Sequence, residues 1–226
     1  MYYYDWTFIL LLPAMLLAFY AQFKVKSTFA KYSSLSSRKG ITGASAAQSI
    51  LNSAGLTDVA VKETPGELSD HYDPRDKTLH LSRDVYNSTS VAALGVAAHE
   101  AGHAVQDGKA YAPLKLRNGM VPVSNLGTSL AFPLFFLGMI FSYRPLMDIG
   151  IVFFSLAVFF SVVTLPVEFD ASKRAIRVLA EGGFLTEEEV PMARAVLNAA
   201  ALTYIAAAAM AILNLIRLVA LRSQRD

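Results

Sequence analysis

Residues 149–167 read IGIVFFSLAVFFSVVTLPV, and this apolar stretch decides the class of fold. It contains no charged residue. A helix needs roughly 20 mostly apolar residues to cross the ~30 Å hydrocarbon core of a bilayer, and only a helix satisfies its own backbone hydrogen bonds there. The stretch is therefore predicted to be a transmembrane helix.

Three further uncharged stretches have a similar length, and the overall composition agrees with a membrane protein. They are residues 6–23, 118–143 and 195–216. Of the 226 residues, 54% are hydrophobic, and the mean hydropathy is +0.40, which is high for a soluble domain. The last stretch is rich in alanine, so a buried helix is an alternative to a span. We expect a mainly α membrane protein with about four transmembrane helices.

Basic residues follow the first and third apolar stretches, which is typical of cytoplasmic segments. They are Lys24, Lys26, Lys31, Arg38 and Lys39 after the first stretch, and Lys173, Arg174 and Arg177 after the third. Both polar regions are therefore expected in the cytoplasm, with the N-terminus outside. Residues 1–5 lack the basic start of a secretory signal, and no cleavage motif follows, so we expect a retained anchor.

The polar segment 24–117 has the composition of a small globular domain. Apolar residues at helical spacing predict a helix over 43–55 and another over 91–107, the second capped by one of residues 88–90. Strand-like pieces separated by turn signals occur at residues 59–62, 71–72 and 78–81. They predict a small sheet with antiparallel pairing.

The helix predicted over 91–107 contains the sequence His99-Glu100-Ala-Gly-His103. Two histidines four residues apart lie on one face of a helix and can converge on a single zinc ion. Glu100 projects beside them and can act as general base toward a water whose pKa zinc lowers from ~15.7 towards ~7. The chain has no cysteine, so any metal must be held by histidine and carboxylate. The small residue Gly102 is expected to allow close approach of another element.

A catalytic zinc has three protein ligands and an open position, so the histidine pair needs a third ligand. With no further histidine nearby, we expect a carboxylate from another helix. Glu168 directly follows the third apolar stretch, on the side of the membrane predicted for the histidines. A carboxylate at a helix start near Pro166 is the alternative role for Glu168.

Three sequence motifs together resemble the YugP-like neutral zinc metallopeptidases of bacteria. They are HEAGH at 99–103, DHYDPRDKTLHLS at 70–82 and LPVEFDAS at 165–172. The resemblance covers residues from about 42 to 208. That family looks distantly related to the HtpX and CAAX-prenyl proteases, in which a small sheet lies above the His-Glu-x-x-His helix and a later glutamate is the third ligand.

The resemblance implies a gluzincin-like site on a small α+β zincin-like cytoplasmic domain, in a multi-pass protein of the bacterial inner membrane. The implied zinc ligands are His99, His103 and Glu168, with Glu100 as the base. The expected regions are a transmembrane helix (1–23), a cytoplasmic metallopeptidase domain (24–117), two transmembrane helices (118–167), a cytoplasmic region with the third ligand (168–194), and a C-terminal apolar helix and tail (195–226).

One position departs from the HtpX-type pattern. That pattern has an aspartate four residues after the ligand glutamate, on the same helical face, where it can orient a ligand histidine. Here the position is Ser172. Asp170 lies two residues after Glu168, about 200° around a helix, so it does not simply substitute. The residues that orient the two histidines are therefore left open.

An oxyanion that develops during peptide hydrolysis needs a hydrogen-bond donor besides zinc. We take Tyr204, a polar residue inside an apolar stretch, as a candidate, although a tyrosine that anchors a span at the interface fits equally well. Other candidates are Arg174, Arg177, His71 and His80. The two histidines are expected to be partly exposed polar residues instead.

These patterns favour a zinc endopeptidase whose site faces the cytoplasm at the membrane surface. By resemblance, its substrates would be membrane-associated or misfolded proteins or peptides. A catalytically inactive metal-binding scaffold is the alternative, and it would have no use for Glu100. A transporter is disfavoured because the apolar stretches carry no charge. Nucleic-acid binding has no support, since the net charge is only +2.

Overall fold

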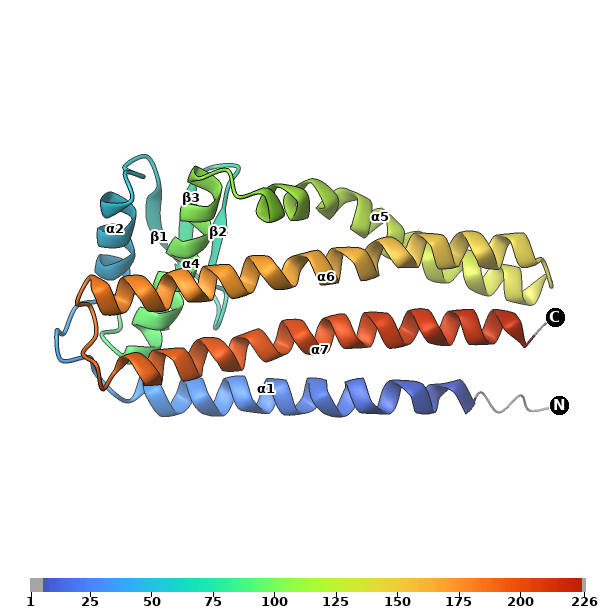
Figure 1. The fold of residues 1–226 in the computed structure, drawn as a ribbon, viewed down its shortest axis with the longest axis horizontal. Coiled ribbons are helices and arrows are strands. Elements are labelled where there is room, and N and C mark those ends of the chain that lie inside the picture. The colour runs from blue at the N-terminus through green and yellow to red at the C-terminus, as the bar shows by residue number, and fades with distance from the viewer. Residues whose placement is uncertain (1–5, 225–226) are drawn as a thin grey trace. The chain divides into compact units, whose positions relative to one another are not determined.

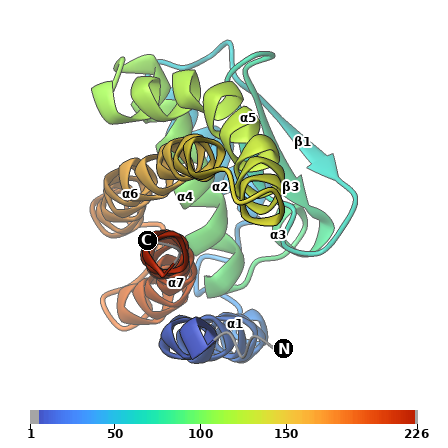
Figure 2. The same cartoon turned by 90° about the vertical axis from the view of Figure 1, so that its right-hand side faces the viewer.

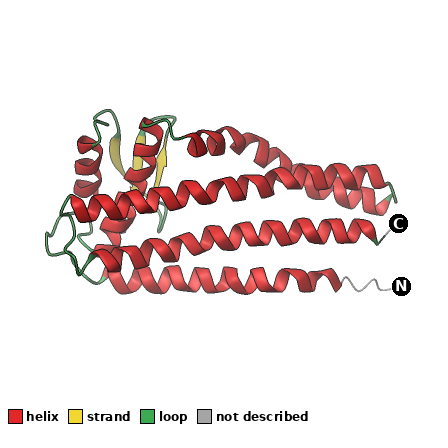
Figure 3. Ribbon diagram, viewed as in Figure 1, coloured by secondary structure: helices red, strands yellow, loops and turns green. Residues whose placement is uncertain are grey.

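The computed structural model describes residues 6–224, so the first five residues of the predicted anchor and the last two of the chain lie outside the description. The helices are η1 (Trp6–Leu11), α1 (Leu12–Ser33), α2 (Gly43–Ser53), α3 (Arg83–Tyr86), α4 (Val91–Gly108), α5 (Ala112–Ile140), α6 (Arg144–Glu181) and α7 (Val190–Ser223). The strands are β1 (Ala60–Thr64), β2 (His71–Asp73) and β3 (Thr78–Ser82). Helices dominate the described chain, as Figures 1 and 3 show.

Four helices are long and apolar enough to cross a membrane. They are Thr7–Ser33, Ala112–Ile140, Arg144–Glu181 and Val190–Ser223. Large apolar side chains such as Phe19, Phe23 and Ile140 are about 70% exposed, which a lipid environment explains. The expected mainly α membrane protein with four candidate spans and a small α+β part is confirmed. The alanine-rich stretch falls in α7, which meets the same criteria of length and hydropathy.

The chain forms two compact units. The helical unit comprises the described residues up to Ala21, Lys115–Pro166 and the described residues from Thr203 onward; the mixed unit comprises Gln22–Leu114 and Val167–Leu202. The helical unit has its own apolar core, in which Phe135 and Met147 are fully buried. The mixed unit contains the sheet and all three residues of the predicted zinc site.

The sheet of the mixed unit has the strand order β1-β3-β2. β2 pairs with β3 antiparallel, as expected, but β1 pairs with β3 parallel, so the prediction of an antiparallel sheet is wrong for this pair. The three strands alternate in direction along the chain. Residues 65–70 lead from β1 at one edge of the sheet to β2 at the other edge. The β2–β3 hairpin then places β3 between β1 and β2. β3 then runs in the same direction as β1.

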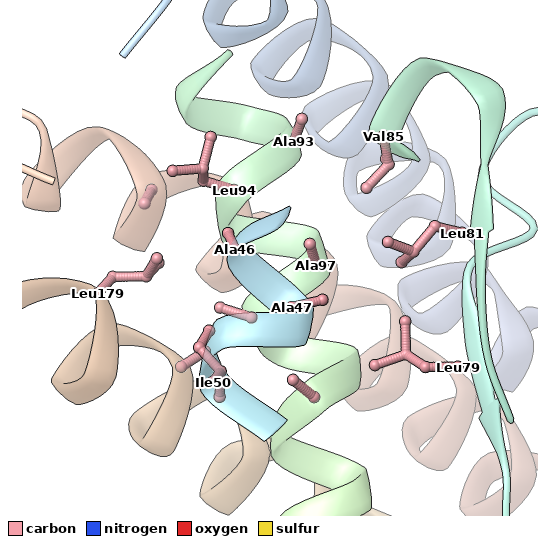
Figure 4. Close-up of a cluster of buried hydrophobic side chains, with 14 of the residues drawn as sticks. Ala46, Ala47, Ile50, Leu79, Leu81, Val85, Ala93, Leu94, Ala97 and Leu179 are labelled. Atoms are coloured by element: carbon pink, nitrogen blue, oxygen red, sulfur yellow. The ribbon is translucent and has the colours of Figure 1, made fainter. Parts of the chain in front are cut away.

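Helix α4 packs against α2 and against the sheet (Figures 1 and 2). Figure 4 shows Leu79 and Leu81 projecting from β3 toward the two helices, whose contacting residues include Ala47 and Ala97. All four side chains are fully buried. Burial of a leucine side chain contributes about 1.5–3 kcal/mol, and the alanines let the elements approach closely. This core fixes the position of α4, the helix that carries the two histidines.

The ends of α4 and α2 agree with the local sequence. Ser90 caps α4, because its side chain accepts a hydrogen bond from the backbone N–H of Ala93 at 3.1 Å. Thr42 caps α2 in the same way. Helix α2 ends at Ser53, and the following Gly55 has a φ of +76°, a conformation that glycine adopts without strain. The expected helix boundaries are thus confirmed to within a few residues.

Candidate metal centre

The two histidines of the motif lie one turn apart on α4, and Glu168 approaches them from α6. The imidazole rings of His99 and His103 are 4.8 Å apart and nearly perpendicular. The Glu168 carboxylate oxygen Oε2 lies 3.3 Å from His99 Nε2 and 3.6 Å from His103 Nε2. The side chain of Glu168 is only 2% exposed. The structure therefore brings together the three residues that the sequence predicts as ligands.

The spacing and chemistry of these three side chains fit a zinc ion. Zinc binds imidazole nitrogen and carboxylate oxygen at about 2.0–2.1 Å, so two ligand atoms of a tetrahedral site lie about 3.3 Å apart. The two distances to Glu168 Oε2 are close to this value. One ligand atom from each residue lies within 4.8 Å of the others, close enough for a single metal ion. A buried carboxylate facing two imidazole nitrogens also needs a positive charge nearby.

Gly102 sets the close approach of α4 and α6. A Cβ atom at this position would lie 3.0 Å from the backbone oxygen of Ala171 and 3.4 Å from its Cα atom. The prediction that Gly102 admits another element is confirmed. Ala171 follows Glu168 by three residues on α6, so this contact helps set how deeply Glu168 reaches toward the histidines.

Each histidine directs its other ring nitrogen toward a polar side chain. His99 Nδ1 lies 3.1 Å from the hydroxyl of Ser172, and His103 Nδ1 lies 3.0 Å from Gln106 Oε1. Ser172, the position that departs from the HtpX-type pattern, thus contacts a histidine. Sequence reasoning missed Gln106. The available signal was its position three residues after His103, a long polar side chain on the same helical face.

Gln106 connects His103 to α6. The side chain is fully buried, and its Nε2 donates hydrogen bonds to the backbone oxygen of Val167 at 2.9 Å and to Asp170 Oδ2 at 2.8 Å. Arg174 Nε in turn donates to the same carboxylate oxygen at 2.5 Å. Asp170 therefore meets His103 only through Gln106, which agrees with its predicted place on a different face of α6 from Glu168.

Glu100 stands beside the cluster with a half-buried side chain. Within residues 6–224, its carboxylate forms neither a hydrogen bond nor an ion pair. Burial lowers the pKa of His103, but the carboxylates of Glu168, 3.6 Å from Nε2, and of Glu100 outweigh this effect and raise the pKa overall. Burial raises the pKa of Asp70 above its ordinary value. Hydrogen bonds from Ser82 offset this rise only in part, and the negative charge of Glu100 adds to it. Glu100 is thus the uncommitted carboxylate of the site.

The candidates for stabilising the oxyanion lie in different parts of the structure. Tyr204 belongs to the helical unit, on α7, whereas the metal cluster belongs to the mixed unit, and its catalytic role stays a prediction. His71 and His80 stack on each other at 4.7 Å, and His71 Nδ1 lies 2.8 Å from the backbone oxygen of Ser69. His71 is exposed and His80 half-buried, as expected for polar residues of a small sheet.

Arg174 and Arg177 line a cavity of about 230 Å³ together with Lys109. The remaining lining residues come from α2 and the residue that follows it, Ala54, and from α4 and α6, and they are mostly apolar. On α4 they include Ala98 and Gly102, which lie on a neighbouring face from the histidines. No residue of the metal cluster lines this cavity.

Four apolar helices and a largely buried His-His-Glu cluster define a membrane protein with a candidate zinc centre. Residues 7–223 match the model of the family described as "Putative neutral zinc metallopeptidase", and the chain belongs to this family. It is 46% identical over 210 residues to the "Putative membrane protease YugP" of Bacillus subtilis (strain 168), a match that covers 93% of each chain. No solved structure matches the chain. The resemblance seen in the three motifs is confirmed, and the family and the cluster together assign zinc as the cofactor.

Proposed function

We propose that this membrane protein is a zinc endopeptidase in which His99, His103 and Glu168 hold the metal and Glu100 is the general base. The family and the similar protein support zinc protease chemistry. The proposed site rests on one observation above all: both histidines turn Nε2 toward Glu168 Oε2, at distances that suit the ligands of one tetrahedral zinc.

The chain's own residues then have distinct roles. Bound zinc supplies Lewis-acid chemistry, which polarises the scissile carbonyl and lowers the pKa of a water molecule. Glu100 accepts a proton from the attacking water and passes it to the leaving amine. Its carboxylate suits this role, since no side chain in the described part of the chain binds it. Tyr204 stays the donor that the sequence predicts for the oxyanion that develops on the substrate.

The lengths of the helices support a site near the membrane surface. Helix α6 has 38 residues and is therefore about 57 Å long, well beyond the ~30 Å of a bilayer core. Its uncharged stretch ends at Val167, and Glu168 follows directly. Basic residues cluster just after the first and third apolar stretches, at 24–39 and 173–177, which favours a cytoplasmic location for the mixed unit. Substrates are accordingly proteins or peptides close to the cytoplasmic face of a bacterial inner membrane.

Metal content tests the ligand set. Wild type is expected to purify with about one zinc per chain, and His99→Ala, His103→Ala and Glu168→Ala each to lose most of it. Asp170→Ala removes a carboxylate of the same helix that is not a ligand but binds Gln106, so it is expected to lose less zinc than Glu168→Ala. Unchanged zinc in Glu168→Ala, with loss in Asp170→Ala, would reverse the assignment.

Glu100→Gln separates the enzyme from the alternative, a metal-binding scaffold without hydrolysis. Glutamine has a similar shape but cannot act as the base, and general acid and base catalysis typically contributes 10²–10⁴-fold. The variant should retain zinc and fold, yet cleave an unfolded protein substrate at least about 10²-fold more slowly than wild type. A chelator should abolish the wild-type activity. Chelator-sensitive cleavage at the wild-type rate would exclude Glu100 as the base.

A further inference from the structure

We infer that Gln106 is a positioning residue that fixes the tautomer of His103, so that the lone pair of Nε2 faces the metal. The inference rests on the proposed zinc site and extends it to a residue outside the His-Glu-x-x-His motif. It follows from the hydrogen-bonding capacities of four groups that meet between α4 and α6.

The orientation of the Gln106 amide is determined by its two partners on α6. The backbone oxygen of Val167 and the carboxylate of Asp170 can only accept hydrogen bonds. They lie 2.9 Å and 2.8 Å from the same end of the amide, so this end must be the NH₂ group. Arg174 donates to the Asp170 carboxylate as well, which favours its ionised form. The carbonyl oxygen of Gln106 must then face His103.

This orientation fixes the proton on His103. Gln106 Oε1 can only accept, and it lies 3.0 Å from His103 Nδ1, so Nδ1 carries the hydrogen. A neutral imidazole has a single N–H group, which leaves Nε2 with its lone pair. Nε2 points at Glu168 Oε2 at 3.6 Å. Two acceptor atoms then face each other, an arrangement that a shared metal cation would stabilise.

Burial makes this arrangement specific. The Gln106 side chain is fully buried, so water does not replace its partners. Val167 immediately precedes Glu168, so the same amide holds both the histidine and the segment that carries the third ligand. His99 lacks such a constraint, because the Ser172 hydroxyl beside its Nδ1 can donate or accept. Loss of Gln106 should therefore disturb His103 and leave the tautomer of His99 unchanged.

The tautomer can be measured directly on the zinc-loaded full-length protein in detergent micelles. The chain has only four histidines, so ¹⁵N-histidine NMR resolves the ring nitrogens after assignment by single substitutions. In wild type, His103 Nδ1 is expected to carry a proton and Nε2 none. An unprotonated Nδ1 with the metal bound there would overturn the inference, whatever any variant does.

Zinc affinity, measured by competition with a chelator, provides the second test. Gln106→Leu is expected to weaken zinc binding about 10–100-fold, as loss of a partner that orients a ligand histidine does. Leu51→Ala is the control, because it removes a fully buried side chain of α2 in the same core and should lower stability without changing zinc affinity. Wild-type affinity in Gln106→Leu would refute the inference. Zinc retained by His103→Ala would instead refute the proposed site itself.

Discussion

Replacement of Gly102 by alanine tests whether the close approach of α4 and α6 builds the metal site. The new Cβ would lie 3.0 Å from the backbone oxygen of Ala171, closer than an ordinary contact, and no side chain can rotate away to relieve it. Helix α6 must move by a few tenths of an ångström. Glu168, three residues earlier on α6, would move away from the histidines with it.

Gly95 provides a matched control on the same helix. A Cβ at Gly95 would meet the side chain of Ala193 at 3.6 Å, an ordinary contact. Both substitutions gain about 1 kcal/mol from the higher helix propensity of alanine. Only Gly102→Ala adds the cost of overpacking, typically about 1–3 kcal/mol. The difference between the two variants therefore isolates the contact: Gly102→Ala should be less stable than Gly95→Ala by about 1–3 kcal/mol.

The assay combines unfolding of the metal-free protein in detergent with chelator competition for zinc. Gly95→Ala should equal or exceed wild type in stability and bind zinc with unchanged affinity. Gly102→Ala should bind zinc about tenfold more weakly, a loss similar to that of a partner that orients a ligand. If Gly102→Ala matched Gly95→Ala in both measurements, the approach of the two helices would not be what positions Glu168.

Three further predictions follow from other parts of the structure. The chain has no cysteine, so single cysteines can be labelled in intact cells with an impermeant thiol reagent. The reagent should label Tyr143→Cys, in the exposed loop between α5 and α6, and should not label Glu67→Cys, which is exposed in the mixed unit. The opposite pattern of labelling would show that the predicted topology is inverted. Ser172→Ala should weaken zinc binding about tenfold, whereas Ser172→Asp should retain it, because a carboxylate can also accept a hydrogen bond from His99; equal affinities would remove Ser172 from the site. Burial raises the pKa of Glu189, but hydrogen bonds from the backbone N–H groups of Thr186 and Arg38 lower it by more. The net pKa of Glu189 is therefore below its ordinary value. The stability that this carboxylate contributes is thus present above its unfolded-state pKa and is lost as the pH falls through its folded-state pKa. Acid should therefore lower the thermal stability of wild type more than that of Glu189→Gln.

Much of the fold was predictable because the signals are local. Uncharged stretches of sufficient length predict the four membrane helices, and Ser90 with the periodicity after it predicts the start of α4. The spacing of His99 and His103 is likewise a property of one helix. Glu168 was predicted differently, from the absence of cysteine and the matching side of the membrane, and the structure brings its carboxylate to the two histidines.

What the sequence did not predict depends on partners that are distant along the chain. The parallel pairing of β1 and β3 results from the strand order, which no single turn signal encodes. Gln106 is as compatible with an exposed helix surface as with a buried one when only its neighbours are known. Its role depends on Asp170, which lies 64 positions away and meets it only when α6 packs on α4.

Two helices supply every group of the proposed metal centre and its immediate support. Helix α4 provides His99, His103 and Gln106. Helix α6 provides the Glu168 carboxylate that faces the histidines, Ser172, which contacts His99, and Asp170, which binds Gln106. Neither helix supplies the proposed ligand set alone, because both histidines lie on α4 and Glu168 lies on α6. Any change in the separation of α4 and α6 therefore alters the ligands and the residues that orient them at the same time. Zinc affinity should for this reason report the packing of these two helices more sensitively than the stability of the unit as a whole.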